Sequence, residues 1–142
     1  MAKIIATEHE EQKAFIEYCN LQGGDWLRFY AIPNGGDRHP AVAAKLKAEG
    51  VRKGVLDLCL PVARGGYHGL YIEMKRRKGG KLSDDQANEQ VKLRQAGYCA
   101  EVAKGWEEAV NITKDYLCST SDYVRHENLL IGERNEKIKR PY

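Results

Sequence analysis

The alternation of apolar and polar positions along the chain predicts helices separated by short strands. After Trp106, the mostly apolar positions 109, 110, 113, 116 and 117 recur at helical spacing, which predicts an amphipathic closing helix. Two capping boxes, Thr7 with Glu10 and Ser83 with Gln86, mark the starts of two other helices. The predicted helices span residues 8–22, 41–49, 84–97 and 106–117, and Pro40 and Gly50 bound the second of them.

Short β-prone runs lie between these helices. They cover residues 28–32, 56–62, 69–75 and 98–103. The segment Arg64-Gly65-Gly66 separates the second run from the third and predicts a hairpin. The resulting order is αβαββαβα, which predicts an α/β fold with a mixed sheet flanked by helices.

Length and composition restrict the class of protein. A chain of 142 residues, with 42% hydrophobic and 30% charged residues, suits one globular domain and excludes the disordered, collagenous and membrane classes. No apolar run approaches the roughly 20 residues that span a bilayer, so we expect a cytoplasmic protein with no membrane partner. The cysteines are far apart and form no CxxC pair, which predicts free and mostly buried thiols: Cys19, Cys59, Cys99 and Cys118.

The chain divides into a folded part, residues 1–118, and a polar extension, residues 119–142. The only apolar cluster of the extension is residues 129–131. The extension is therefore interpreted as a tail, an extra helix or a strand that pairs with a partner.

Charge is unevenly distributed. The net charge of the chain is +3, whereas residues 38–81 carry eleven basic and three acidic side chains, a net charge of +8. A block of this sign favours contact with a polyanion, most commonly nucleic acid. A solvated basic loop explains the same charge equally well.

Two acidic residues and a lysine form the first candidate site. If the hairpin turns about Gly65, residues whose numbers sum to 130 lie opposite each other, and Asp57 and Glu73 are such a pair. Opposed side chains on one face lie about 4.5–5.5 Å apart at Cβ, so two carboxylates there can share a cation. Lys75 shares the face of Glu73, because side chains alternate along a strand. The alternative is an ordinary exposed pairing of Glu73 with Lys75 or Arg76.

The first helix supplies a further acid. Its apolar residues Phe15, Ile16 and Cys19 define an inward direction, and Glu8 and Gln12 are expected near it. By the same calculation Glu11 falls at the edge of that face, at about 85°. The alternative for Glu8 is a surface position favoured by the helix dipole.

Gln86 has two interpretations, as a site residue and as a member of its capping box. The histidines, His9, His39, His68 and His126, show no spacing typical of metal ligands.

Four motifs give the chain a resemblance to a known family. They are the turn NGG, the strand entry GVRKGVLD, the strand IEMK and the helix start LSDDQ. In this order they resemble the VRR-NUC nucleases of the restriction-endonuclease-like PD-(D/E)xK superfamily, especially the stand-alone forms of bacteria and phages. The resemblance covers about residues 7–118. Leu56 stands where the superfamily name leads one to expect proline.

The resemblance implies an Mg²⁺- or Mn²⁺-dependent nuclease acting on DNA. It assigns the metal to Asp57, Glu73 and Glu8, with Gln12 one turn later. It assigns catalytic roles to Lys75 and Gln86 as well, and implies a homodimer that prefers branched DNA such as four-way junctions. The expected phosphate contacts are Asn34, Gly35, Arg52, Lys53, Arg76, Arg77, Lys78 and Lys81. The alternatives are a non-catalytic DNA-binding module and a structural domain held by ordinary salt bridges.

Overall fold

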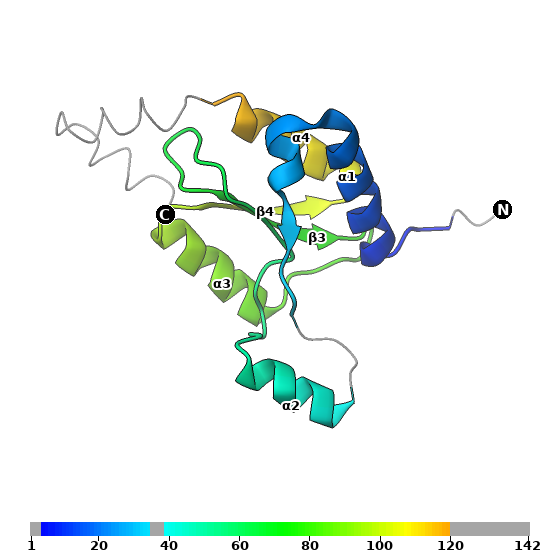
Figure 1. Cartoon of the computed structure of the whole chain (residues 1–142). Coiled ribbons are helices and arrows are strands. Elements are labelled where there is room, and N and C mark those ends of the chain that lie inside the picture. The colour runs from blue at the N-terminus through cyan, green and yellow to red at the C-terminus, as the bar shows by residue number, and fades with distance from the viewer. Residues whose placement is uncertain (1–3, 35–38, 120–142) are drawn as a thin grey trace.

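The computed structural model describes residues 4–34 and 39–119, which form a mixed sheet covered by helices (Figure 1). The predicted order αβαββαβα is confirmed, with one added 3-10 helix. The elements are α1 (Glu8–Gln22), η1 (Gly24–Arg28), β1 (Tyr30–Ala31), α2 (Pro40–Ala48), β2 (Leu58–Leu60), β3 (Leu70–Lys75), α3 (Asp84–Gln95), β4 (Cys99–Lys104) and α4 (Trp106–Leu117). Both capping boxes form as predicted, at Thr7 and at Ser83.

The sheet has the strand order β1-β2-β3-β4. β1 and β3 are antiparallel to β2, whereas β4 is parallel to β3. Leu58 lies opposite Ile72 and Leu60 lies opposite Leu70, which is the register that the hairpin argument predicts. The connecting loop closes at Arg64 and Tyr67, whose backbones pair, around two glycines with positive φ.

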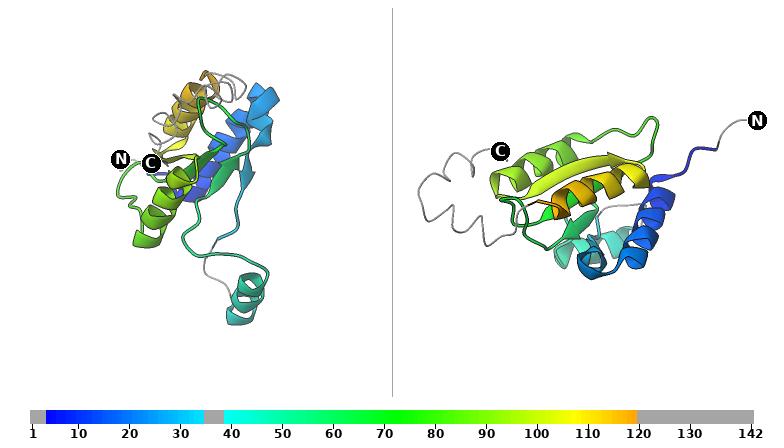
Figure 2. Two further views of the ribbon diagram at one scale, coloured as in Figure 1. Left: turned by 90° about the vertical axis from the view of Figure 1, so that its left-hand side faces the viewer. Right: turned by 90° about the horizontal axis from the view of Figure 1, so that it is seen from above.

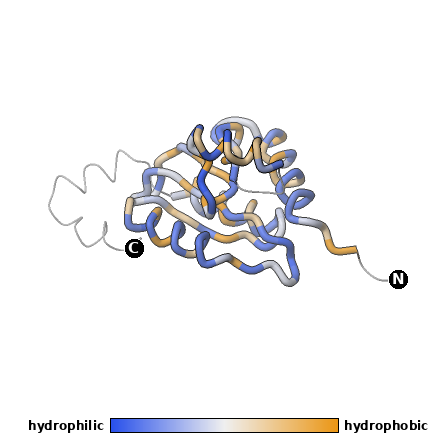
Figure 3. The backbone as a smooth tube through the Cα atoms, turned by 90° about the horizontal axis from the view of Figure 1, so that it is seen from below, coloured by the Kyte–Doolittle hydropathy of each residue, from blue (hydrophilic) through white to orange (hydrophobic). Residues whose placement is uncertain are grey.

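The core lies between one face of the sheet and the helices α1 and α4. Leu58, Ile72 and Met74 are fully buried on that face, and Phe15 of α1 and Ala109 of α4 pack against them. Figure 1 shows α1 and α4 together above the sheet and α3 below it. Hydrophilic and hydrophobic residues alternate along the coiled parts of the backbone, as expected for helices with one covered face (Figure 3).

Helix α2 stands away from this core. None of its residues is buried, although Pro40 opens it as predicted and His39 accepts a hydrogen bond from the Ala41 amide. The left view of Figure 2 shows it apart from the sheet, on the connection between β1 and β2.

Two local predictions need correction. The expected strand over residues 28–32 is only Tyr30–Ala31, because residues 24–28 form η1, where Asp25 pairs with Arg64 at 2.8 Å. The thiols are free as expected, but only Cys19 and Cys59 are buried, while Cys118 is exposed. The interpretations of the polar extension concern residues 120–142, which lie outside the described residues. Among residues 4–34 and 39–119, no helix combines the length and the hydropathy that a bilayer span requires.

Candidate active site

Asp57 is held immediately before β2, facing β3. Its carbonyl accepts a 2.8 Å hydrogen bond from the Ile32 amide, which extends the pairing of β1 with β2. Its carboxylate Oδ2 accepts from the Met74 amide at 2.8 Å, and Oδ1 accepts from the side chain of Asn34 at 3.4 Å. Continuing the register by one residue before Leu58 therefore places Asp57 opposite Glu73.

Glu73 is a buried acid with one occupied and one open oxygen. Only 1% of the residue is exposed. Its Oε1 lies 3.0 Å from Lys75 Nζ and 2.6 Å from Gln86 Nε2. With both carboxylates ionised, its buried Oε2 has no hydrogen-bond partner among the described residues; with a proton present, Glu73 and Asp57 hydrogen-bond to each other. A buried carboxylate oxygen without a partner is costly, so this atom is suited to a ligand.

Burial raises the proton affinity of both site carboxylates. Burial raises the pKa of Glu73 to about 7, and the neighbouring Asp57 charge adds to the shift, while Lys75 opposes it. Burial also raises the pKa of Asp57, against the hydrogen bond from Met74 and the charge of Lys75. The site therefore holds an excess of negative charge that a cation would stabilise.

Lys75 joins the sheet to α1. Its side chain is 7% exposed, and its ammonium contacts Glu73 and, at 3.7 Å, Glu8 Oε1. Glu8 is half exposed, at 48% of its side chain, so it faces the site from the rim rather than from the buried stripe. Gln12, one turn later, is half-buried.

Both interpretations of Gln86 hold in the structure. Its Oε1 accepts from the Ser83 amide at 3.0 Å, which completes the capping box, while its Nε2 donates to Glu73. One side chain therefore fixes the start of α3 and the orientation of a site carboxylate.

These residues fit a divalent metal ion with few protein ligands. No group of three or more His, Cys, Asp or Glu side chains in the described ranges is arranged to hold a metal. Asp57 and the open Oε2 of Glu73 offer two carboxylates, and Mg²⁺ commonly binds through one or two carboxylates, with water and phosphate oxygens completing its shell. The residues that would hold the ion are therefore Asp57 and Glu73.

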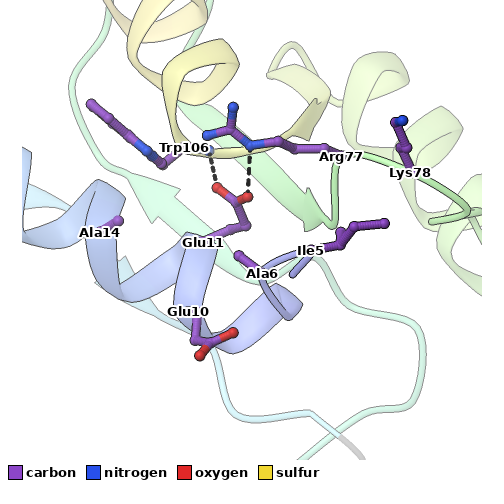
Figure 4. Close-up of a pocket in the computed structure, with 8 residues that line it drawn as sticks. All are labelled: Ile5, Ala6, Glu10, Glu11, Ala14, Arg77, Lys78 and Trp106. Atoms are coloured by element: carbon purple, nitrogen blue, oxygen red, sulfur yellow. Dashed lines mark hydrogen bonds and ion pairs between the residues drawn. The ribbon is translucent and has the colours of Figure 1, made fainter. Parts of the chain in front are cut away.

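Glu11, which was expected at the edge of the inward face of α1, is buried. Glu11 is 1% exposed and accepts hydrogen bonds from Arg77 Nε at 2.9 Å and from the Trp106 amide at 2.8 Å (Figure 4). The expected direction was wrong because it averaged over Ile16, which is only partly buried. The spacing of four residues from Glu11 to Phe15 to Cys19 was the signal that identifies the buried stripe.

The basic residues separate into paired and open side chains. Arg77 does not fit the expected role of a phosphate contact, because Glu11 and Glu107 already pair with its guanidinium, at 2.9 and 2.6 Å. Lys53 lies 3.0 Å from Asp85, and Asn34 is held by the Val55 carbonyl and by Asp57. Gly35 lies outside the described residues. The remaining expected contacts are all exposed: Arg52, Arg76, Lys78 and Lys81.

A family model and a solved structure that match this chain both carry the name of the VRR-NUC domain. The VRR-NUC domain model matches residues 6–107. A solved structure described as a VRR_NUC domain protein superposes with a TM-score of 0.70 at 30% sequence identity, over 80% of this chain and 90% of that chain. No curated protein matches the chain.

Proposed function

Because this chain belongs to the VRR-NUC domain family, a nuclease-type domain, we propose that it hydrolyses phosphodiester bonds of DNA with Mg²⁺ or Mn²⁺ held by Asp57 and Glu73. The observation that carries the proposal is the buried Glu73 Oε2, which has no hydrogen-bond partner among the described residues. It belongs to a carboxylate whose other oxygen is held by Lys75 and Gln86.

The remaining residues have separate tasks. A bound divalent ion supplies a polarised phosphoryl oxygen and a water of lowered pKa. Lys75, held between Glu73 and Glu8, directs its ammonium toward the attacking water or a phosphate oxygen. Gln86 keeps Glu73 in one orientation.

Exposed cations near the site support binding through phosphates. Arg52, Lys53, Arg76, Lys78 and Lys81 are exposed on the loops that precede β2 and follow β3. Such contacts position DNA without reading its sequence, so binding is expected to weaken steeply with salt and to depend little on base sequence.

We further propose that the protein acts as a homodimer on branched DNA. The resemblance to stand-alone VRR-NUC nucleases supports this, as does the match between paired sites and a symmetric substrate. Sedimentation of a monomer at micromolar concentration, or equal cutting of linear and four-way DNA, would contradict this part.

The test is cleavage of matched linear, flap and four-way DNA with Mg²⁺, Mn²⁺ or chelator. The wild type is expected to cleave with either metal and to be inactive in chelator. The variants Asp57→Ala and Lys75→Ala are expected to lose activity. Equal rates for these variants and the wild type would contradict the proposal. Binding without cleavage in either metal would identify a non-catalytic DNA-binding module instead.

A further inference from the structure

A row of aromatic side chains crosses the sheet beside the proposed active site. Tyr30 of β1 pairs with Cys59 of β2, and Cys59 pairs with Tyr71 of β3. Paired residues of neighbouring strands point to the same face, so both tyrosines lie on one face. Tyr71 precedes Glu73 by two positions on β3, which places this face on the side of the active site.

Tyr98 and His68 extend the row at the other side of the sheet. The Tyr98 ring packs edge to face on Tyr71, with centroids 5.3 Å apart, and His68 packs on Tyr98 at 5.6 Å. Tyr98 lies over Gly69, where a Cβ would sit 3.4 Å from its ring carbon Cδ1. We call Tyr30, Tyr71, Tyr98 and His68 the aromatic row.

The aromatic row is partly open to solvent, whereas the other face of β2 and β3 is buried. Tyr30 is 51% exposed and lies on the edge strand, and His68 is exposed as well. Tyr71 and Tyr98 are half-buried. Mutual packing of the rings accounts for Tyr71 and Tyr98, whereas Tyr30, whose side chain hydrogen-bonds with that of Cys59, still leaves about half of its surface open to solvent.

The distance from the row to the carboxylates suits a nucleic acid strand. Two residues along a strand span about 7 Å, so Tyr71 of the row lies about that far from Glu73. A phosphate at the carboxylates would therefore bring neighbouring bases of the same strand over the rings.

We infer that the aromatic row binds unpaired bases of the DNA strand whose phosphate lies at Asp57 and Glu73, an inference that rests on the proposed function. Neutral rings attract phosphates poorly, but each offers a surface on which a base can stack. Paired bases are stacked inside the duplex and cannot occupy the row. The row therefore favours DNA with single-stranded or distorted positions next to the cleaved bond.

The test compares two fluorescent single-stranded probes of equal length, an oligothymidine and the same backbone with abasic positions, in chelator so that neither is cleaved. Both carry the same phosphates, so any difference in affinity comes from the bases. The wild type is expected to bind the oligothymidine about tenfold more tightly. The variant Tyr30→Ser is expected to lose most of that preference, while Tyr30→Phe retains it.

Leu27→Ala is the matched control, because Leu27 is an exposed apolar side chain, 57% exposed, outside the row. It is expected to leave the preference unchanged. If Tyr30→Ser fails to fold by thermal melting, His68→Ala takes its place with the same expectation. Equal affinity of the wild type for both probes, or an unchanged preference in the row variant, would overturn the inference.

Cleavage of fully paired DNA, measured in parallel, separates this inference from the proposed function. Hydrolysis with an unchanged probe preference in Tyr30→Ser would contradict only the aromatic row. A base-dependent preference without hydrolysis in Mg²⁺ or Mn²⁺ would contradict the nuclease proposal and support the row as a base-binding surface.

Discussion

Gln86 donates a 2.6 Å hydrogen bond to Oε1 of Glu73 from the first turn of α3. Because Lys75 lies 3.0 Å from the same oxygen, Oε1 is fully engaged and Oε2 is the oxygen left for a ligand. Hydrogen bonds to a metal-binding carboxylate commonly fix its orientation and tune its affinity. The start of α3 and the chemistry of the site are thus set by one side chain.

Replacing Gln86 with alanine is expected to lower activity without unfolding the protein. Removal of a residue that orients a metal ligand typically costs about 10–100-fold in metal affinity or activity. Steady-state cleavage and Mn²⁺ affinity of Gln86→Ala against the wild type measure the effect.

The matched control for Gln86 is Ser83→Ala. Loss of an N-cap costs about 1 kcal/mol of stability. It leaves in place the side-chain amide of Gln86, which donates to Glu73. We expect Ser83→Ala to lower the melting temperature and keep Mn²⁺ affinity. If both variants lost metal affinity equally, the role of Gln86 would be only to cap the helix.

Stabilisation by a divalent metal should increase with pH through neutrality. The pKa of Glu73 is raised from 4.5 to about 7, chiefly by burial. Metal binding requires the ionised carboxylate, so affinity rises as pH passes 7. The shift in melting temperature caused by Mg²⁺ is expected to be larger at pH 8 than at pH 6.

The metal-free protein should show the opposite trend. Between about pH 4.5 and 7 the folded state keeps a proton on Glu73 that the unfolded chain releases. The contribution of this group to the free energy of unfolding therefore falls as pH rises through that window.

A shift in melting temperature by Mg²⁺ that stays the same from pH 6 to pH 8 would rule out Glu73 as a ligand.

Asp57→Asn is expected to stabilise the metal-free protein at pH 8. The change removes a negative charge beside the buried Glu73 and keeps an oxygen for the Met74 amide. Relief of such a strained site commonly adds about 1 kcal/mol. Thermal melting in chelator measures the change, and a clear loss of stability would mean that Asp57 serves the fold rather than a ligand.

Glu11 is expected to matter more for stability than Glu107, although both pair with Arg77. Glu11 is buried and also accepts from the Trp106 amide, which opens α4. Glu11→Ala leaves that amide without its partner, at a cost of about 1–3 kcal/mol. Glu107, with a 54% exposed side chain, should contribute little. Melting of Glu11→Ala and Glu107→Ala side by side checks this order, and equal losses would contradict it.

Local signals predicted the frame of the fold because they act over a few residues. The capping boxes at Thr7 and Ser83 fix where α1 and α3 begin. The register around Gly65 follows from the period of two along a strand, so the sequence alone predicts the pairing of Asp57 with Glu73. These predictions needed no knowledge of long-range packing.

The errors occur where distant residues decide the outcome. η1 forms where a strand was expected, and Asp25 within it pairs with Arg64 of the hairpin loop. The spacing of Glu11 from Phe15 and Cys19 signals its burial, but the partners that satisfy its buried carboxylate, Arg77 and Trp106, lie 66 and 95 residues away. The aromatic row is visible only once β1, β2 and β3 are aligned. Periodicity within one element carries no information about such partners.

The most direct test of the account is calorimetric titration of Mn²⁺ into the wild type, Asp57→Asn and Glu73→Gln at pH 8. The account predicts a specific Mn²⁺ site in the wild type and the loss of that site in both variants. Both variants are expected to remain folded, with melting temperatures at or above that of the metal-free wild type. Equal Mn²⁺ binding by all three proteins would contradict the claim that these two carboxylates hold the ion.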